Sequence, residues 1–459
     1  MTFVALCLLL GAGHLLRTRI KLLQKLYLPS CVVAGLFGLL IIQTFAAMDS
    51  LGQPIHKINS LISDWTKLWA VLPAFLINVV FACLFLGVRI PKFSTLWKRS
   101  GPQVVYGQIV AWGQYVVGLG LWLVVLGQLF PQLPSMFAAV LPVGFEGGHG
   151  TAAGLAPVFE ERGWPQGKDF ALTSATFGIL SAITFGMILI NWAVRKGHVL
   201  AKEPSQLGGN GPAGFIPLDR RPSAGKLVVS SDVVETFSLQ IVVVGIAIGL
   251  AYLFKAALVA IENPIPFMAK HKILAGFPLF PLCMIGGLIV QILEDRFDKH
   301  NLIDPGLMRR IQNTSLDFLV VAAIATISLK VVLAGLIPLL LLVGAGIAWN
   351  VFCVLVLARK FLPDAWFERS MAEMGQSMGV TATGLLLLRV VDPDYETPAA
   401  DAFACKQLVH EPFMGGGLWT AAAIPLIAVI GAAKVFMIAA CVMTIWVMLG
   451  LLPRFFSRR

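Results

Sequence analysis

Long apolar segments recur from one end of this sequence to the other, and few folds can accommodate such a chain. A helix needs about 20 mostly apolar residues to cross the hydrocarbon core of a bilayer. We expect these segments to be spans: 2–16, 28–47, 68–88, 104–129, 170–194, 234–257, 273–293, 315–335, 337–358, 408–431 and 434–452. The first could be a signal peptide, but basic residues follow it rather than precede it, which favours a span. The sequence therefore predicts an all-α polytopic protein whose main partner is the lipid bilayer.

Composition and charge agree with a membrane protein. The chain is 58% hydrophobic and only 13% charged, whereas soluble domains carry about 25% charged residues. The net charge of +11 does not indicate a nucleic-acid partner, because the basic residues lie between apolar segments, as in cytoplasmic loops. The seven cysteines are scattered and form no CxxC pair. Neither a disulfide framework nor a zinc site is predicted from them.

The basic clusters predict the side of the membrane that each loop faces. Lys and Arg follow the first span, follow the span at 68–88, fill the linker after 170–194 and end the chain. Placing these clusters on the cytoplasmic side puts the N-terminus outside and the C-terminus inside. All of these clusters can lie on the cytoplasmic side only if two broken apolar segments, 135–157 and 371–390, do not cross the membrane. Each of them must enter and leave it on the same side. We therefore expect two re-entrant hairpins, one from each face.

The two broken segments resemble each other in sequence. GGHGTAAGL at 147–155 and SMGVTATGL at 377–385 share Thr, Ala, Gly and Leu at an offset of 230 residues. The same offset maps the span at 2–16 onto the span at 234–257. Each half then contains five spans and one re-entrant hairpin, and an odd number of crossings inverts the second half relative to the first. This pattern is typical of transporters built from inverted repeats.

The repeat divides the chain into three parts. We expect a first membrane repeat at 1–195 and a second, inverted repeat at 234–459 that carries about one extra C-terminal span. Residues 196–233 lie between them and are rich in Gly, Pro and Ser, as in GGNGPAGFIP. Such a composition is typical of a flexible loop, and its basic residues predict a cytoplasmic linker.

The tips of the two hairpins are the predicted binding site. Glycines let backbone groups approach a ligand, half-helix N-termini favour an anionic carboxylate, and exposed carbonyls favour Na⁺. The alternative for the glycines is tight helix packing, for the threonines a hydrogen bond within their own helix, and for the histidine a structural role. The predicted substrate- and ion-binding residues are Gly147, Gly148, His149, Gly150, Thr151, Gly379, Thr381, Thr383 and Gly384.

Four charged residues in apolar surroundings are possible contributors, because charges inside a membrane are costly. Glu146 could bind a cation or a proton, and Arg389 could hold a carboxylate in a bidentate pair. Asp317 could instead face water, and Lys330 could extend its ammonium to the membrane interface. The ligands of a bound Na⁺ are not defined beyond the two tips.

Several motifs resemble those of the bacterial sodium/glutamate symporter family. The resemblance covers roughly residues 1–400, and the first hairpin tip is its most specific motif. The segments that carry it are LLLGAGHLLRTRIKLLQKLYLPSCVVAGL (8–36), GGHGTAAG (147–154), VFEERGW (158–164), SATFGIL (174–180), ISLKVVLAGLIPLLLLV (327–343) and GQSMGVTATG (375–384). The resemblance implies a moving transport domain on a dimerising scaffold, hence a homodimer. It also implies Na⁺-coupled glutamate uptake across the bacterial inner membrane without ATP.

The chain departs from the family at several positions. Glu146 stands where the family tends to have Ser, Ala382 stands where the second tip usually has Pro, and Asp317 lies in a span that is usually uncharged. The stretch DAFACKQLVHEPFMGGGLW at 401–419 matches poorly. These departures leave the substrate and the coupling ion open.

The sequence therefore predicts a secondary active transporter that carries glutamate or a similar anionic amino acid with Na⁺ by alternating access. A transporter of the same fold that uses H⁺, or that carries a di- or tricarboxylate, is one alternative. A channel or a non-transporting receptor is another. We expect no enzyme activity and no cofactor other than Na⁺ as coupling ion, because no nucleophile–base set, phosphate loop or metal cluster stands out.

Overall fold

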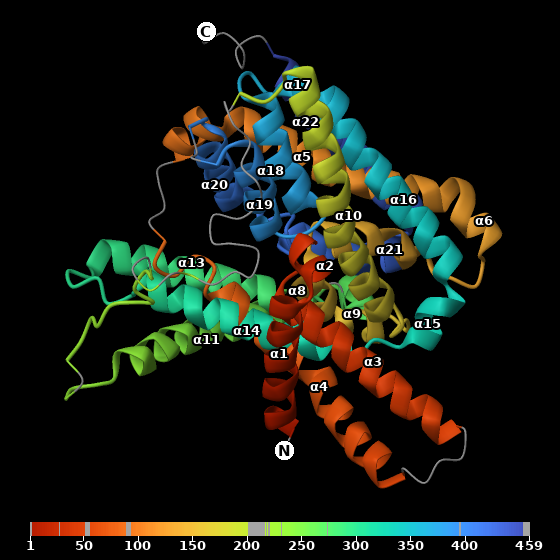
Figure 1. The fold of residues 1–459 in the computed structure, drawn as a ribbon, viewed down its shortest axis with the longest axis vertical. Helices are drawn as coiled ribbons and strands as arrows, with labels where there is room; N and C mark the ends of the chain where they lie inside the picture. Colours follow the sequence, from red (N-terminus) through yellow and green to blue (C-terminus); the bar gives the residue numbers. More distant parts are fainter. Residues whose placement is uncertain are drawn as a thin grey trace.

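The computed structural model of the chain is all-helical. It describes residues 2–26, 28–50, 56–88, 93–200, 216, 218, 221–230, 232–272, 274–393 and 396–452. Within these residues there is no β-strand (Figure 1). Much of the predicted linker at 196–233, including 201–215, lies outside the described residues, as does the C-terminal basic stretch from 453.

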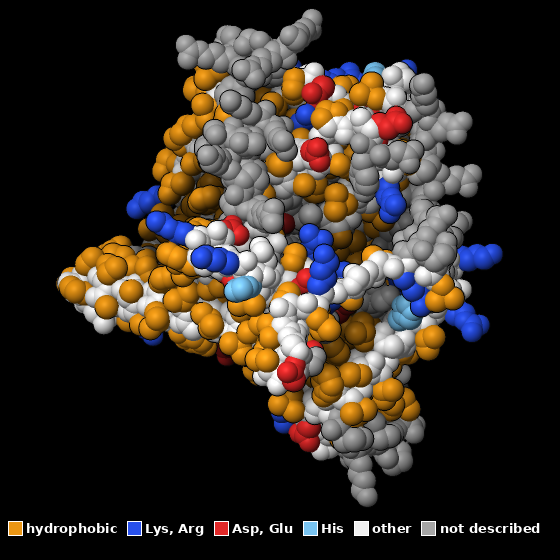
Figure 2. Space-filling model, turned by 90° about the vertical axis from the view of Figure 1, so that its left-hand side faces the viewer, with side chains coloured by type: hydrophobic (Ala, Val, Ile, Leu, Met, Phe, Trp, Pro, Cys, Tyr) orange, Lys and Arg blue, Asp and Glu red, His pale blue; other side chains and the backbone are white. Residues whose placement is uncertain are grey.

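Seven helices of the described part are long and apolar enough to cross a membrane. They span Ser30–Met48, Asn59–Ala82, Ser100–Leu129, Gly167–Lys196, Thr236–Glu262, Leu336–Phe361 and Ala432–Leu451. Each overlaps a span expected from the sequence, although the helix expected at 68–88 lies at Asn59–Ala82, and the polytopic membrane class is confirmed. Figure 2 shows hydrophobic side chains over much of the visible surface, as expected where a protein faces lipid.

Two segments that we expected to be single spans are each divided into two helices. The segment at 315–335 contains the end of α14 (Pro305–Ala325) and then α15 (Leu329–Ala334). The segment at 408–431 contains the end of α20 (Ala399–His410) and then α21 (Leu418–Ile430). The second break contains GGG at 415–417, where glycine weakens a continuous helix.

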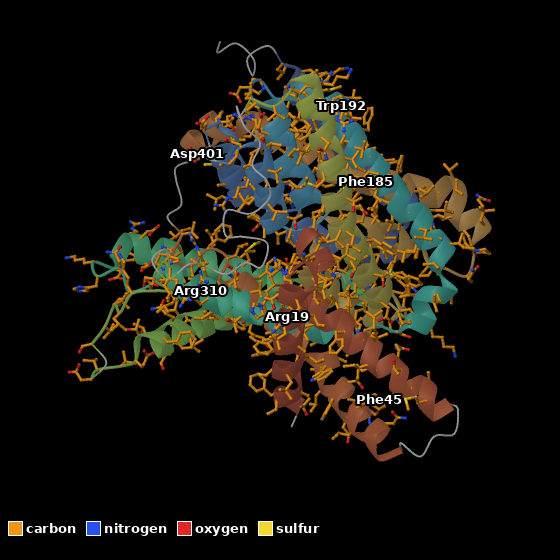
Figure 3. The ribbon with its side chains drawn as sticks, viewed as in Figure 1. Arg19, Phe45, Phe185, Trp192, Arg310 and Asp401 are labelled. Carbon is orange, nitrogen blue, oxygen red and sulfur yellow. The ribbon has the colours of Figure 1, made fainter. Side chains whose placement is uncertain are left out.

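The helices pack in two groups. The first group consists of α1 (Thr2–Arg19), α3 (Ser30–Ser50), α4 (His56–Ala82), α11 (Thr236–Glu262), α13 (Phe280–Phe297) and α14. In Figure 1 these helices extend to the left and downward, with Phe45 at the far end of α3 in Figure 3. The second group consists of α5 (Phe93–Leu121), α7 (Val140–Phe145), α8 (Gly148–Gly154), α10 (Gly167–Lys196), α16 (Leu336–Phe352), α18 (Trp366–Ser377), α19 (Thr381–Val391), α20, α21 and α22 (Ala432–Leu451). Helix α8 contacts both α4 and α14, so the groups meet at the first tip.

Small residues bring the helices of the first group close together. A Cβ added at Gly286 of α13 would lie 2.2 Å from the carbonyl oxygen of Ala247 in α11. A Cβ added at the next residue, Gly287, would lie 2.2 Å from the carbonyl oxygen of Ala82 in α4. Backbone contacts of this kind are typical of helices packed in a membrane. The glycine pair therefore holds α13 between α11 and α4.

Local sequence signals fix several helix ends. Asp304 precedes α14 and accepts a hydrogen bond from the backbone N–H of Leu307 at 2.8 Å, and Pro305 occupies the first helical position. This is a typical N-terminal cap. Gly197 ends α10 with φ 68°, the left-handed conformation that favours glycine.

Among the described residues, a π-helical segment occurs once in each half of the chain. Helix α5 passes into a π-helix at Trp122–Leu126, and α16 passes into a π-helix at Cys353–Leu357. The second segment begins 231 residues after the first, close to the offset of 230 between the tip sequences. π-Helices are rare and occur mostly as single turns inside α-helices. The two halves thus share a local feature at corresponding positions, while their inverted relation stays a prediction.

Both segments expected to be broken helices are broken. The first is interrupted between α7 and α8 at Glu146 and Gly147, and the second between α18 and α19 at residues 378–380. Helices α18 and α19 pack against each other. The chain therefore turns back at the second tip.

Candidate functional site

A cavity of about 600 Å³ lies where the two helix groups meet at the tips. Helices α4 and α14 of the first group line it together with the two tips and α20 of the second group. Its apolar lining includes Ile77 and Phe81 of α4 and Phe403 of α20. Its polar lining residues are Glu146, Thr151, Arg309, Gln312, Asn313, Gln376, Thr381, Gln407 and Glu411.

The two tips are in direct contact at the cavity. Gly148 has φ +65°, and a Cβ added there would lie 3.1 Å from Cγ1 of Val380 and 3.3 Å from the carbonyl oxygen of Gly379. Residues with L side chains rarely adopt this backbone conformation. Glycine at position 148 therefore allows the first tip to turn while lying against the second.

The predicted residues of the first tip divide into two sets. Gly147, Gly150 and Thr151 line the cavity. His149 does not appear in the cavity lining. It is buried, and its Nε2 lies 3.0 Å from Oγ1 of Thr176 in α10. The side chain of His149 thus joins the tip to a neighbouring helix.

The second tip also contributes only part of its predicted set to the cavity. Thr381 lines the cavity, and its hydroxyl donates to Oε1 of Glu411 at 2.8 Å. Thr383 is buried outside the cavity lining. A Cβ added at Gly384 would lie 2.4 Å from the carbonyl oxygen of Ala372, so this glycine allows α19 to pack on α18. Gly379 lies at the contact with Gly148.

Of the four predicted charged contributors, only Glu146 lines the cavity. Its side chain is 1% exposed, and Oε2 accepts a hydrogen bond from Nε2 of Gln376 at 3.0 Å. Nε2 of His410 lies 3.3 Å from the same oxygen. Oε1 of Glu146 is buried without a hydrogen-bond partner among the described residues. A buried carboxylate oxygen without a partner is costly, so this atom is suited to a cationic ligand.

The other three charged residues lie away from the cavity lining. Asp317 is on α14 beside Cys31 of α3. Lys330 is exposed in the first turn of α15, and Arg389 is exposed near the end of α19. Their roles in binding stay predictions.

The structure also brings in polar residues that the sequence interpretation missed. Gln407 of α20 donates to Oγ1 of Thr381 at 2.6 Å and to Oε1 of Glu411 at 3.0 Å. Lys406 of α20 is fully buried and forms an ion pair with Glu373 of α18 at 2.7 Å. The signal in the sequence is KQLVHE at 406–411, in which Lys406 and His410 are four residues apart on one face of a helix.

The charges of the cavity favour a ligand with a positively charged group. Two carboxylates, Glu146 and Glu411, line it, and Arg309 is the one Lys or Arg among the described lining residues. A carboxylate attracts Na⁺ and ammonium groups, whereas the Arg309 guanidinium is suited to hold a carboxylate. The cavity thus presents partners for both ends of an amino acid.

Thr151→Val tests whether the first tip takes part in transport. This nearly isosteric change removes a hydroxyl that lines the cavity. Loss of one neutral hydrogen bond costs about 1 kcal/mol, so we expect Na⁺-dependent uptake to fall about fivefold with unchanged expression. Thr173→Val is the matched control, because the Thr173 hydroxyl donates to the Asp169 carbonyl within α10. Unchanged uptake by Thr151→Val would remove this hydroxyl from the site.

Broken helices that line a polar cavity inside a bundle of apolar helices define a class, the multi-pass membrane transport proteins. The comparison with known families identifies the group within that class. The family model described as sodium/glutamate symporter matches residues 1–396, and the chain belongs to this family. No curated protein matches the chain. The protein is therefore a transporter and not an enzyme, and its family couples glutamate transport to Na⁺.

The family match ends before α20 begins. Lys406, Gln407, His410 and Glu411 thus lie outside the matched residues, although two of them line the cavity. The poorly matching stretch at 401–419 is consequently part of the candidate site.

Proposed function

We propose that the protein is a secondary active transporter that carries glutamate or a similar anionic amino acid together with Na⁺ by alternating access. The observation that carries this proposal is the cavity at the two contacting tips, which is lined by Arg309 and by Glu146, whose buried Oε1 has no hydrogen-bond partner among the described residues. The family membership supports the same substrate and ion.

The chemistry of the cavity favours an amino acid over a di- or tricarboxylate. The ammonium group of an amino acid is a partner for Oε1 of Glu146, and a substrate carboxylate is a partner for Arg309. A dicarboxylate has no cationic group for Glu146 and would add charge to a cavity that already holds two carboxylates. Na⁺ compensates the net negative charge that glutamate brings into the membrane.

The proposal includes the architecture expected from the sequence. Residues 1–195 and 234–459 form inverted repeats, each with a re-entrant hairpin, and the paired π-helices and paired broken helices support this reading. Transport then moves the second helix group against the first, because the cavity lies between them. A homodimer in the bacterial inner membrane, with the N-terminus outside and the C-terminus in the cytoplasm, follows from the resemblance and the basic clusters.

One observation favours H⁺ as an alternative coupling ion. Glu146 and His410 are two titratable groups whose side chains lie 3.3 Å apart, and Glu146 lines the cavity. A proton bound to this pair would neutralise charge in the same place as Na⁺. The cycle would then respond to pH in the absence of Na⁺.

Uptake of labelled L-glutamate into proteoliposomes tests the function. We expect saturable accumulation with an inward Na⁺ gradient and none when K⁺ replaces Na⁺ at constant pH. Accumulation driven by a pH gradient without Na⁺ would favour the H⁺ alternative. Saturable uptake of a dicarboxylate but not of glutamate would contradict the amino-acid assignment. Flux without saturation or accumulation would indicate a channel, and binding without flux a receptor.

A further inference from the structure

The hydrogen-bond acceptors around the Lys406 ammonium among the described residues are three side-chain oxygens. Its Nζ donates to Oε1 of Glu373 at 2.7 Å, to Oε1 of Gln376 at 3.0 Å and to Oε1 of Gln407 at 2.9 Å. An ammonium group has three N–H donors and no acceptor, so each donor has one oxygen. The side chains of Lys406 and Glu373 are both 0% exposed.

The surroundings of the ammonium are shaped to hold a cation. Gln103 of α5 donates to Oε2 of Glu373 at 2.9 Å, so both oxygens of that carboxylate have partners. Gly107 of α5 lies over the pair. A Cβ added there would be 2.5 Å from Cε of Lys406 and 2.7 Å from Oε1 of Glu373. One carboxylate and two amide oxygens are also the ligand types that hard metal cations prefer.

Two amides connect this site to the cavity. The Gln376 amide accepts from Lys406 and donates to Glu146, and the Gln407 amide accepts from Lys406 and donates to Thr381. Both glutamines line the cavity. The ammonium therefore orients one amide toward each tip, as a bound coupling cation would.

We propose that the Lys406 ammonium is a built-in cation that occupies the position of a coupling Na⁺ beside the two tips. This inference rests on the proposed Na⁺-coupled transport. It adds that one cation of the site is part of the protein and is not bound from solution. Removal of the ammonium leaves a buried Glu373 carboxylate without its countercharge, which is strongly destabilising. A Na⁺ ion that enters the vacated site removes that penalty.

The test is thermal unfolding of the full-length protein without substrate, titrated with NaCl while N-methyl-D-glucamine chloride keeps the ionic strength constant. Lys406→Ala should have a lower Tm than wild type in low Na⁺. Its Tm should rise with Na⁺ by several degrees more than that of wild type, because an ion that binds only the folded state stabilises it. Lys406→Ala/Glu373→Gln is the matched control, since its site has no charge. The Tm of this double variant should rise with Na⁺ by no more than the Tm of wild type does.

An equal Na⁺ response in wild type and Lys406→Ala would contradict the inference and leave the ion pair a structural role. A Lys406→Ala protein that does not fold even in Na⁺ would contradict it as well, because Na⁺ would then not replace the ammonium. The readout involves neither glutamate nor transport. It is therefore separate from the uptake assay, which alone decides the proposed function.

Discussion

Glu146→Gln is expected to reduce Na⁺-dependent uptake of L-glutamate by about 30-fold or more. The substitution keeps the size of the side chain and removes the charge of a buried carboxylate on a residue that lines the cavity, and Oε1 of this carboxylate has no hydrogen-bond partner among the described residues. Loss of one partner of a buried charge pair costs about 2–5 kcal/mol, which corresponds to this factor at its lower end. Initial uptake rates across a range of glutamate concentrations, normalised to reconstituted protein, measure the effect.

The matched control is Glu160→Gln, because Glu160 is exposed in α9 (Ala156–Glu161), shortly after the first tip. That variant should transport at the wild-type rate. Competition by glutarate, which lacks the amino group of glutamate, adds a test of the proposed contact. Glutarate should compete for uptake more weakly than unlabelled glutamate in wild type. This difference in competition should be smaller in Glu146→Gln. A variant that retains wild-type uptake and the same preference would exclude Glu146 as the partner of the ammonium group.

Gly416→Ala should abolish most uptake through a steric effect at the first tip. Gly416 has φ +90°, and a Cβ added there would lie 2.2 Å from Oγ1 of Thr151 and 2.8 Å from Cζ of Phe81. Both of those residues line the cavity. The left-handed conformation alone costs a residue with a Cβ about 1–2 kcal/mol, and the overlap adds to it. We therefore expect at least a tenfold loss of uptake, measured in the same proteoliposome assay.

The neighbouring glycine provides the control for this prediction. A Cβ added at Gly415 would meet its nearest atom, Cγ of Glu411, at 3.4 Å, an ordinary contact. Gly415→Ala should therefore retain most of the uptake. Equal losses in both variants would indicate a general sensitivity of the segment after α20, and equal retention would show that the first tip does not need its observed position.

The sequence predicts the membrane helices well because hydropathy depends only on neighbouring residues. The long span Thr236–Glu262 follows directly from its high mean hydropathy of 2.3. The breaks at Gly147 and near Gly379 are also evident, since glycine and polar residues interrupt otherwise apolar segments. The contact between the tips agrees with their sequence similarity, although they lie more than 200 residues apart in the chain.

The direction of individual side chains could not be predicted in the same way. The backbone of a tip is irregular, so residue spacing does not reveal that Thr151 faces the cavity while His149 contacts Thr176 of α10. For Lys330 and Arg389, an apolar neighbourhood in the sequence did not distinguish an exposed side chain from a buried one.

The contribution of α20 was missed for a different physical reason. The span at 408–431 was expected from the apolar character of that segment as a whole. Helix α20 instead begins at Ala399 and ends at His410, before the glycines. Its polar partners are remote in sequence. Glu146 is 264 residues from His410, and Glu373 is 33 residues from Lys406. Only the packed structure brings these groups together.

The most direct test of the central claim is a cryo-electron microscopy structure of the protein in lipid nanodiscs with L-glutamate and Na⁺. We predict density for the amino acid in the cavity between the tips, with its ammonium group at Oε1 of Glu146 and a carboxylate toward Arg309. Density for glutamate at another place, with this cavity empty, would contradict the assignment of the tips as the binding site.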